Sequence, residues 1–456
     1  MYIMNKNIKN LLAAITLLAV ITSCDSKLDV APTQSIDETN ALATAQDVEV
    51  TLIGAYDGMS SSNLYGGAIQ YSGELLGDDS EVRFNGTYTT LDELWRKTIT
   101  TTNTQTRDTW TFAYSAINRA NNVISALDKV GASDKGRVEG AARFIRGAMY
   151  FELVRLWGKD FNDGDANTNL GVPLVLTPTR GITDADYTAR ATVAAVYKQV
   201  IEDLTKAATL LPETSASDNF GFASSSAATA ILSRVYLQQG KYAEALAAAN
   251  SVIESGNHEL ASSFADAFSD DTNEGEVIFR VLINEQDGVN SMNTFYAPTT
   301  FQGRGDIRIQ SKHLGLYEAG DERASFFVKA SGNTFSAKYL DQYGDVPVIR
   351  LAELYLTRAE CNQRLGSKVG ASPENDINMI RERSGLSPLT SINLTAILKE
   401  RKLELAFEGL QVHDAKRLKK NVTSSIVYNA NQLVLPIPQR EIDTNKSLVQ
   451  NPGYNN

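Results

Sequence analysis

The sequence predicts a mainly α protein built from stacked helical hairpins, with long irregular segments between them and only minor β-sheet. Apolar residues recur at helical spacing along most of the chain, and clusters of Gly, Ser and Asp divide the periodic stretches into pairs. Two long segments, residues 60–106 and 283–312, lack that period. Strand-like runs are short, as at residues 277–281 and 433–435, and predict little sheet.

Length and composition are those of a folded globular chain. The 456 residues are 43% hydrophobic and 21% charged, which excludes an intrinsically disordered protein and provides for a large core. The formal net charge of −11 argues against nucleic-acid binding, because phosphate contacts need clustered Lys and Arg. The one basic run, residues 416–420, is predicted to end a helix, where cations interact favourably with the helix dipole.

The first residues have the pattern of a secretory leader. Lys6 and Lys9 precede an uncharged apolar run over residues 11–21. This run is about half as long as the ~20 residues that a membrane-spanning helix needs. Removing the two lysines with the leader changes the formal charge from −11 to −13.

A cysteine follows the apolar run. The sequence Ile21-Thr22-Ser23-Cys24 resembles the bacterial lipobox, in which the thiol accepts a diacylglyceryl group. We therefore predict a signal peptide over residues 1–23, lipidation of Cys24, a lipidated tether over residues 24–36 and a single α-helical domain over residues 37–456. Several acyl chains on one cysteine suffice for stable membrane attachment. An ordinary secretory signal with an incidental cysteine is the alternative.

The first helical hairpin is predicted between residues 110 and 156. Apolar residues recur at steps of three and four over residues 110–127 and again over residues 141–156. Between them, Gly131-Ala132-Ser133-Asp134 supplies turn and capping residues. The second stretch has two apolar rows, so we expect that helix to be packed on two sides.

A second hairpin, over residues 236–246, closely resembles the centre of a tetratricopeptide repeat. Gly240 is expected to end the first helix, Tyr242 to pack in the turn, and Ala245 to let the two helices approach. Serines 224–226 offer N-caps for the leading helix. Further helices are predicted from periodicity at residues 193–211, 350–366 and 373–384. Stacked hairpins bury a continuous core and present a concave face that suits binding.

The sequence contains no recognisable catalytic or metal-binding motif. His258, His313 and His413 are scattered, and no G-x-S-x-G, Walker A, HExxH or CxxC motif occurs. The Asp-rich loop at residues 160–165 offers oxygen ligands for Ca²⁺, but it lacks the register and closing Glu of an EF-hand. Turn-forming Asp and Asn side chains explain the loop as well. We predict no catalytic residue, no resident metal and no cofactor.

Three acids in the C-terminal third require partners. Glu400, Glu404 and Glu408 fall on one face of a predicted helix, and a buried carboxylate without a cation is costly. We predict a structural role for them. The candidate partners are Arg350, Arg358 and Arg417.

A series of short motifs occurs in a fixed order over nearly the whole chain. They are Ser23-Cys24-Asp25 with Leu28-Asp29 and Pro32, residues 116–124, residues 143–147 with 150–153 and Trp157-Gly158, residues 347–353 with 358–360, residues 381–385, residues 400–409, residues 435–438 with Glu441-Ile442, and residues 451–454. In this order the motifs resemble the SusD/RagB family of Bacteroidetes outer-membrane lipoproteins. The chain departs from the family at residues 410–415, where an aromatic or Arg usually precedes an Asp-Leu pair.

The resemblance implies a SusD-like fold and a function. Proteins of this family sit on a SusC-like TonB-dependent transporter in the outer membrane, facing the exterior. They capture oligosaccharides or, in RagB-like members, peptides, and deliver them without catalysis. Two other classes stay open on the residues alone: a repeat scaffold that binds only proteins, and a glycoside hydrolase, which the acid pairs of a chain with 54 acids permit but do not favour.

Ligand contacts are expected in the two long segments, because sugar rings stack on aromatic side chains and sugar hydroxyls bond to Asp, Asn and Arg. The candidates are Asp79, Arg83, Phe84, Tyr88, Tyr296, Phe301, Arg304 and Arg308. Ordinary loop packing is the alternative for each. Trp95 and Trp110 are expected in the core. The second segment has no Trp, which disfavours a starch-like stacking platform, and the arginines leave acidic glycans and peptides open as ligands.

Overall fold

The computed structural model describes residues 42–181, 183–215, 221–269 and 275–454. Residues Thr44–Asn456 form one compact unit. The predicted signal peptide, the lipidated Cys24 and the tether over residues 24–36 all lie outside the described residues. Within the described ranges, no helix combines the length and the apolar character needed to cross a membrane.

The unit is mainly α with minor sheet, as predicted. The helices are α2 (Ala45–Ser60), α3 (Ala68–Gly77), α4 (Thr89–Arg96), α5 (Thr104–Ser125), α6 (Lys135–Trp157), α7 (Val193–Leu210), α8 (Ser225–Gln238), α9 (Tyr242–Glu254), α10 (Ser291–Tyr296), α11 (Ser311–Leu314), α12 (Leu351–Leu365), α13 (Pro373–Arg383), α14 (Leu394–Glu404), α15 (Gln411–Arg417) and α16 (Gln439–Thr444). The strands are β1 (Val82–Phe84), β2 (Leu170–Pro173), β3 (Arg190–Thr192), β4 (Val277–Val281), β5 (Ile307–Ile309), β6 (Phe327–Ala330), β7 (Asn333–Ser336) and β8 (Val346–Arg350).

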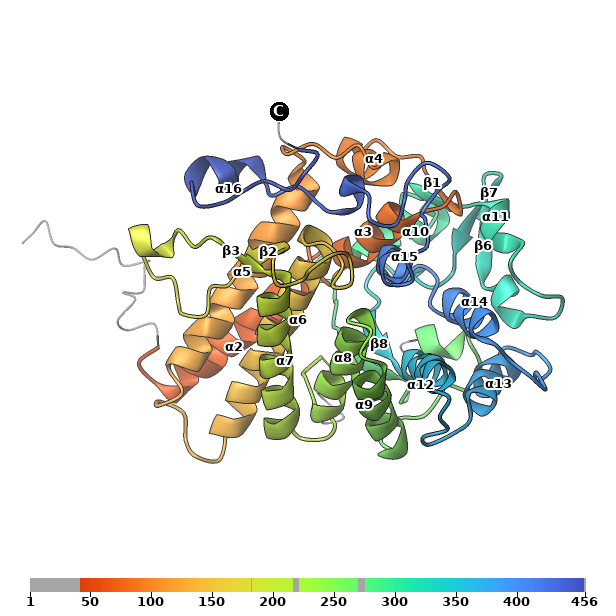
Figure 1. The fold of residues 1–456 in the computed structure, drawn as a ribbon, viewed down its shortest axis with the longest axis horizontal. Helices are drawn as coiled ribbons and strands as arrows, with labels where there is room; N and C mark the ends of the chain where they lie inside the picture. The colour runs from red at the N-terminus through yellow and green to blue at the C-terminus, as the bar shows by residue number, and fades with distance from the viewer. Residues whose placement is uncertain (1–41, 182, 216–220, 270–274, 455–456) are drawn as a thin grey trace, which may run out of the picture. The chain divides into compact units, whose positions relative to one another are not determined.

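The long helices form a row in which each packs against the next. Helices α2, α5, α6 and α7 lie on the left of Figure 1, and α8, α9 and α12 continue the row through its centre. Helix α6 is central: 18 of its 23 residues are buried, which confirms the prediction that it packs on two sides. A row of helical pairs leaves its outer faces and its connecting segments available for binding.

The repeat-like hairpin is α8 and α9. Ser224 is the N-cap among the three candidate serines, and its hydroxyl accepts a hydrogen bond from the amide of Ala227 at 3.0 Å. Gly240 has φ +71°, a left-handed conformation that ends the helix and that glycine adopts without strain. Ala245 is fully buried and packs with Leu237 and Cys361, so the hairpin predicted from the repeat pattern is confirmed.

Three local predictions were wrong. Residues 60–106 are not uniformly irregular, because they contain α3 and α4, and all ten residues of α3 are buried. Residues 433–435 form no strand: Leu433 ends the 3-10 turn Asn431–Leu433, and the two residues after it are irregular. Trp110 is buried as expected, but Trp95 is only half-buried, and its indole donates to Asp78 at 2.9 Å.

The acids of the C-terminal third belong to a buried group of ten charged side chains, here called the inner charge cluster. It contains five cations and five acids: Arg323, Lys338, Arg350, Arg381, Arg383, Glu276, Asp321, Glu400, Glu404 and Glu408. Burial alone would raise the pKa of Glu404, but Arg383, Arg350 and Arg323 hold it at about 2. The cluster joins α14 to the segments on either side of the β6–β7 hairpin.

The cationic partners of these acids were predicted only in part. Arg350 contacts Glu404 at 3.2 Å and Glu408 at 2.7 Å, as expected. Arg358 instead binds Asp376 of α13, and Arg417 binds Asp414 of its own helix α15 and Glu360 of α12. Glu408 lies beyond the end of α14, after the left-handed residue Phe407, so the three acids do not share one helix.

Helices α3 and α15 approach so closely that Glu74 is removed from water. Its carboxylate accepts hydrogen bonds from the amides of Gly409 at 2.8 Å and Leu410 at 3.1 Å. Burial is the dominant effect and raises the pKa of Glu74 to about 7, although these bonds oppose the shift.

This pKa leads to a stability prediction. A carboxyl whose folded pKa exceeds its unfolded value of 4.5 binds more protons in the folded state, so its contribution to stability is lost as pH rises through about 7. We expect Glu74→Gln, which keeps the accepting oxygen, to raise the free energy of unfolding by about 1–2 kcal/mol at pH 8 and to leave it unchanged at pH 4. Denaturation curves at both pH values test this, with the exposed Glu244→Gln as control. Equal effects at the two pH values would contradict it.

Candidate functional site

A four-stranded antiparallel sheet brings the two segments predicted to bind ligand into contact. Its strand order is β1-β5-β7-β6, and β1 pairs with β5 so that Arg83 lies opposite Arg308. The sheet is at the upper right of Figure 1, beyond the end of the helical row. The segments meet because of this pairing, which joins residues far apart in the sequence.

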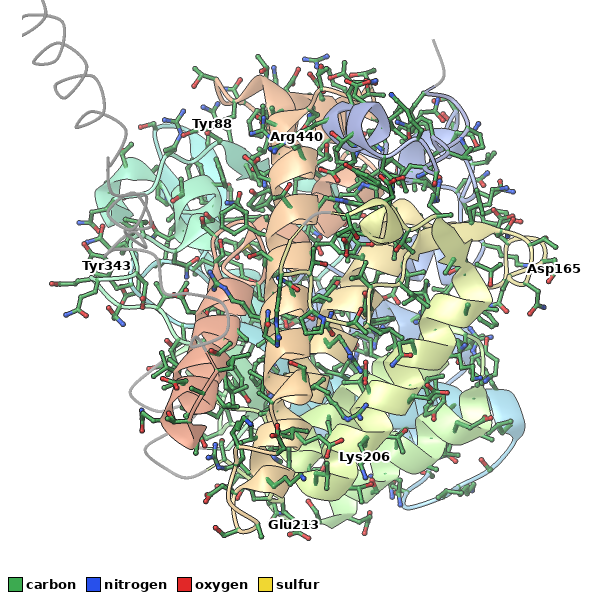
Figure 2. All side chains as sticks on the ribbon, turned by 90° about the vertical axis from the view of Figure 1, so that its left-hand side faces the viewer. Tyr88, Asp165, Lys206, Glu213, Tyr343 and Arg440 are labelled. Carbon is green, nitrogen blue, oxygen red and sulfur yellow. The ribbon has the colours of Figure 1, made fainter. Side chains whose placement is uncertain are left out.

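An exposed tyrosine and an arginine lie against each other beside this sheet. The guanidinium of Arg304 is 4.8 Å from the ring centre of Tyr88, a cation–π contact. The same guanidinium donates to Asp306 and to the hydroxyl of Thr87, both at 2.9 Å, so it connects the two segments. Tyr88 is 45% exposed, and Figure 2 shows it on the outer surface near the turquoise strands.

Aromatic packing beneath Tyr88 fixes its position. Phe295 of α10 contacts the Tyr88 ring edge-on at 5.5 Å and the buried Tyr71 ring of α3 at 5.1 Å. Asp306 is buried, and its backbone oxygen accepts from the amide of Asn85 at 2.7 Å. The exposed ring and the guanidinium are therefore held in place before any ligand arrives, which reduces the entropy lost on binding.

Two further arginines add positive charge. Arg83 and Arg308 face each other across the strand pair, an arrangement of like charges that lowers sheet stability. Arg308 donates to Asn333 at 3.2 Å. The exposed Arg83 makes no ion pair or side-chain hydrogen bond within the described part of the chain. The aromatic and cationic residues Arg83, Tyr88, Phe301 and Arg304, which are exposed, and Arg308, which is half-buried, are here called the Tyr88–Arg304 surface.

The predicted site residues occupy three environments: some lie on the Tyr88–Arg304 surface, two are buried, and Asp79 is in an ion pair elsewhere. Phe301 is 37% exposed on the 3-10 turn Thr299–Phe301 that leads to Arg304. Phe84 and Tyr296 are buried; Tyr296 packs against the rings of Tyr339 and Phe407, so neither side chain offers surface to a ligand in this structure.

Asp79 lies apart from the other candidates, in an ion pair with Lys312 at 2.8 Å. Phe295, Asp306 and Thr87 hold the surface together but were not predicted. Asp306 lies two positions after Arg304, yet nothing in the sequence indicates that it returns to bind it.

The described residues contain no group of three or more His, Cys, Asp or Glu side chains placed to hold a metal ion. In the Asp-rich loop, Asp160 accepts from the amide of Asn162 and Asp165 from that of Asn167, both at 2.9 Å. These are the turn contacts that the alternative explanation of the loop predicts. His313 is bonded to Glu81 at 2.9 Å, whereas His413 is buried and burial lowers its pKa well below the ordinary value.

Two family models match the chain over separate regions. The model described as "Starch-binding associating with outer membrane" matches residues 27–237, and the model described as "SusD family" matches residues 325–425. Between them they include the helical row except α9, β1 of the sheet and most of the inner charge cluster.

Curated relatives and solved structures agree with these matches. SusD-like protein P2 of Formosa agariphila is 25% identical, over 96% of this chain and 98% of that protein. The starch-binding protein SusD of Bacteroides thetaiotaomicron is 29% identical over 123 residues, 24% of this chain and 22% of that protein. A crystal structure from Bacteroides vulgatus ATCC 8482 has TM-score 0.81 and 28% identity, covering 90% of this chain and 99% of that one.

Proposed function

Since this chain belongs to the SusD/RagB family, we propose that it is an outer-membrane lipoprotein that binds oligosaccharides on the Tyr88–Arg304 surface. It delivers them to a SusC-like TonB-dependent transporter and performs no catalysis. Cys24, in its lipobox-like setting, carries the lipid anchor, and the protein faces the exterior of the cell.

Relatives support the carbohydrate part of this proposal. The first family model is described as starch-binding and outer-membrane-associated, and one relative is a starch-binding protein. The proposal for this chain rests mainly on the Tyr88–Arg304 pair: an exposed ring is held rigidly beside hydrogen-bond donors. A sugar offers a C–H face that stacks on such a ring and hydroxyls that accept from such donors.

The charge of the surface indicates which oligosaccharides suit it best. Arg83 and Arg308 concentrate positive charge on a protein whose formal net charge is −11, whereas the charge of Arg304 is offset by Asp306. Guanidinium groups bind carboxylates and sulfates in a two-pronged geometry. We therefore expect glycans that carry uronate or sulfate groups to bind more tightly than neutral glycans of the same length.

Calorimetry tests the proposal directly. A chain that begins at residue 25 keeps the whole compact unit, and we would titrate it with neutral, uronate-containing and sulfated oligosaccharides and with mixed peptides. We expect saturable binding of an acidic oligosaccharide. Tyr88→Ala and Arg304→Ala should each weaken it about tenfold, which corresponds to about 1.4 kcal/mol. Arg83→Ala should reduce its dependence on salt, because one ionic contact is lost.

A closely matched control exists on the opposite end of the fold. Arg364 lies 4.7 Å from the ring of Tyr242 and binds Glu360 at 2.8 Å, the same kind of arrangement as Tyr88, Arg304 and Asp306. Arg364→Ala should leave glycan affinity unchanged. If only peptides bind, the ligand in the proposal becomes a peptide. Turnover of a glycan would refute the absence of catalysis. If Arg364→Ala lowers glycan affinity as much as Arg304→Ala does, the Tyr88–Arg304 surface is not the binding site.

A further inference from the structure

A second concave site lies away from the Tyr88–Arg304 surface, between α3, α14 and α15. It is an open pocket of about 460 Å³, within the range of about 300–1,000 Å³ that is typical of small-molecule sites. Tyr88, Phe301 and Arg304 do not line it. Asp79, the predicted ligand residue that lies apart from the others, does line it, together with its ion-pair partner Lys312.

The walls of the pocket are mainly aliphatic. Leu398 of α14, Leu410, Ala415 of α15, Leu418 and Val422 all contribute to the lining. No aromatic side chain is among the described residues that line it. A stack of sugar rings therefore has no ring to lie on here, and the walls suit a molecule with an apolar body of its own.

Most charges around the pocket are already paired. Asp79 binds Lys312 at 2.8 Å, Glu81 binds Lys402, and Asp414 lies 2.9 Å from Arg401. Glu74, which also lines the pocket, accepts hydrogen bonds from two backbone amides. The acids that line the pocket therefore have little charge left to attract a cation, and they repel an anion less than their number suggests.

Two lysines at the rim differ from the rest. Lys399 reaches Glu318 at 3.2 Å, in a pair whose side chains are both more than 40% exposed, so it competes weakly with another anion. Lys420 is exposed and makes no ion pair or side-chain hydrogen bond with any other described residue. An aliphatic pocket with an unpaired ammonium group at its edge is complementary to an amphipathic anion.

We propose that this pocket binds a small amphipathic anion, a molecule with an apolar body and one carboxylate or sulfonate group. The apolar body occupies the space between Leu398, Ala415 and Leu418, and the anionic group lies at Lys420. This site is separate from oligosaccharide binding and does not depend on it, so either proposal can fail alone.

Two dyes with the same aromatic body separate the two halves of the proposal. 8-Anilinonaphthalene-1-sulfonate carries a sulfonate, whereas N-phenyl-1-naphthylamine is uncharged. We would titrate each into the chain that begins at residue 25, in the absence of detergent, and follow the dye fluorescence. The sulfonate dye is expected to bind at one saturable site per chain and more tightly than the neutral dye.

Variants assign the binding to the pocket. Lys420→Glu should lower the affinity for the sulfonate dye about tenfold and the affinity for the neutral dye less than about twofold, because only the sulfonate contacts the ammonium group. Lys419→Glu is the matched control, since it makes the same charge change at the neighbouring exposed residue, which does not line the pocket. Ala415→Trp should weaken both dyes by filling the cavity, and Leu398→Ser provides a milder test if that variant fails to fold.

The outcomes are decisive in either direction. Weaker binding of the sulfonate dye to Lys420→Glu but not to Lys419→Glu supports the proposal. Equal losses in the two lysine variants would show a general effect of net charge and overturn the anion contact. Dye binding that does not saturate at one site, or that survives both cavity variants, would overturn the pocket itself. Acidic oligosaccharides should bind the Lys420→Glu protein as they bind the unmodified chain.

Discussion

Replacing Arg350 with methionine is expected to lower the free energy of unfolding by about 3–5 kcal/mol, because it leaves buried carboxylates without a cation. The guanidinium is inaccessible to water and contacts Glu276, Glu404 and Glu408 together. Methionine fills much of the volume but neutralises none of the three acids. Chemical denaturation measures the loss as a lower midpoint at unchanged slope.

The pH dependence of this effect has a definite sign. Glu404 has a folded pKa of about 2, below its ordinary value of 4.5, so its contribution to stability is present above pH 4.5 and is lost as pH falls towards 2. The difference between the unmodified chain and Arg350→Met should therefore shrink over that interval. Arg96→Met is the control: its ion pair with Asp92 is exposed, and its removal should cost less than about 1 kcal/mol. A loss of that size in Arg350→Met would contradict the prediction.

Replacing Gly73 with alanine is expected to cost about 3 kcal/mol, the upper end of the usual range for overpacking a core. A Cβ atom at this position would lie 2.2 Å from the carbonyl oxygen of Gly409, and neither backbone can move without separating α3 from α15. The same change should disturb the aliphatic pocket, because Gly77 at the end of α3 and Leu410 just before α15 line it. Thermal denaturation and dye binding measure the two effects.

The control for Gly73→Ala is Gly54→Ala in α2. A Cβ atom there would meet nothing within 4 Å, so alanine should be neutral or stabilise the helix by up to about 1 kcal/mol. A Gly73→Ala protein as stable as Gly54→Ala would show that α3 and α15 are free to separate.

Turn residues and apolar spacing in the sequence predicted the helical scaffold, but they did not predict contacts between segments far apart in the sequence. The hairpins around Gly131 and Gly240 could be read because turn residues and apolar spacing lie close together in the sequence. Helix α3 was not predicted, because it is only ten residues long, contains Gly73 and Gly77, and buries its polar residues together with its apolar ones. Which arginine binds which glutamate depends on how α12, α13 and α14 pack. The prediction that the three glutamates bind Arg350 was therefore correct in part, whereas Arg358 and Arg417 bind other acids.

The candidate site shows the same division. Aromatic and charged residues marked residues 60–106 and 283–312 as segments of interest, and Tyr88 and Arg304 do lie together. Whether a given side chain points outward depended on the pairing of β1 with β5 and on packing below it. Phe84 and Tyr296 have the same composition signal as Tyr88 and Phe301, yet they are buried.

The pairing of β1 with β5 also has a consequence for the order of folding. Thr87 and Arg304, which are bonded across the two segments, lie 217 positions apart in the sequence. Contacts of such long range form slowly because a long loop must close first, whereas neighbouring helices such as α5 and α6 join through a short turn. During synthesis from the N-terminus, Tyr88 is made early. The surface cannot form until Arg304 has been added, when about two thirds of the chain has been made. Recovery of ligand binding after refolding should therefore lag behind recovery of helical circular dichroism.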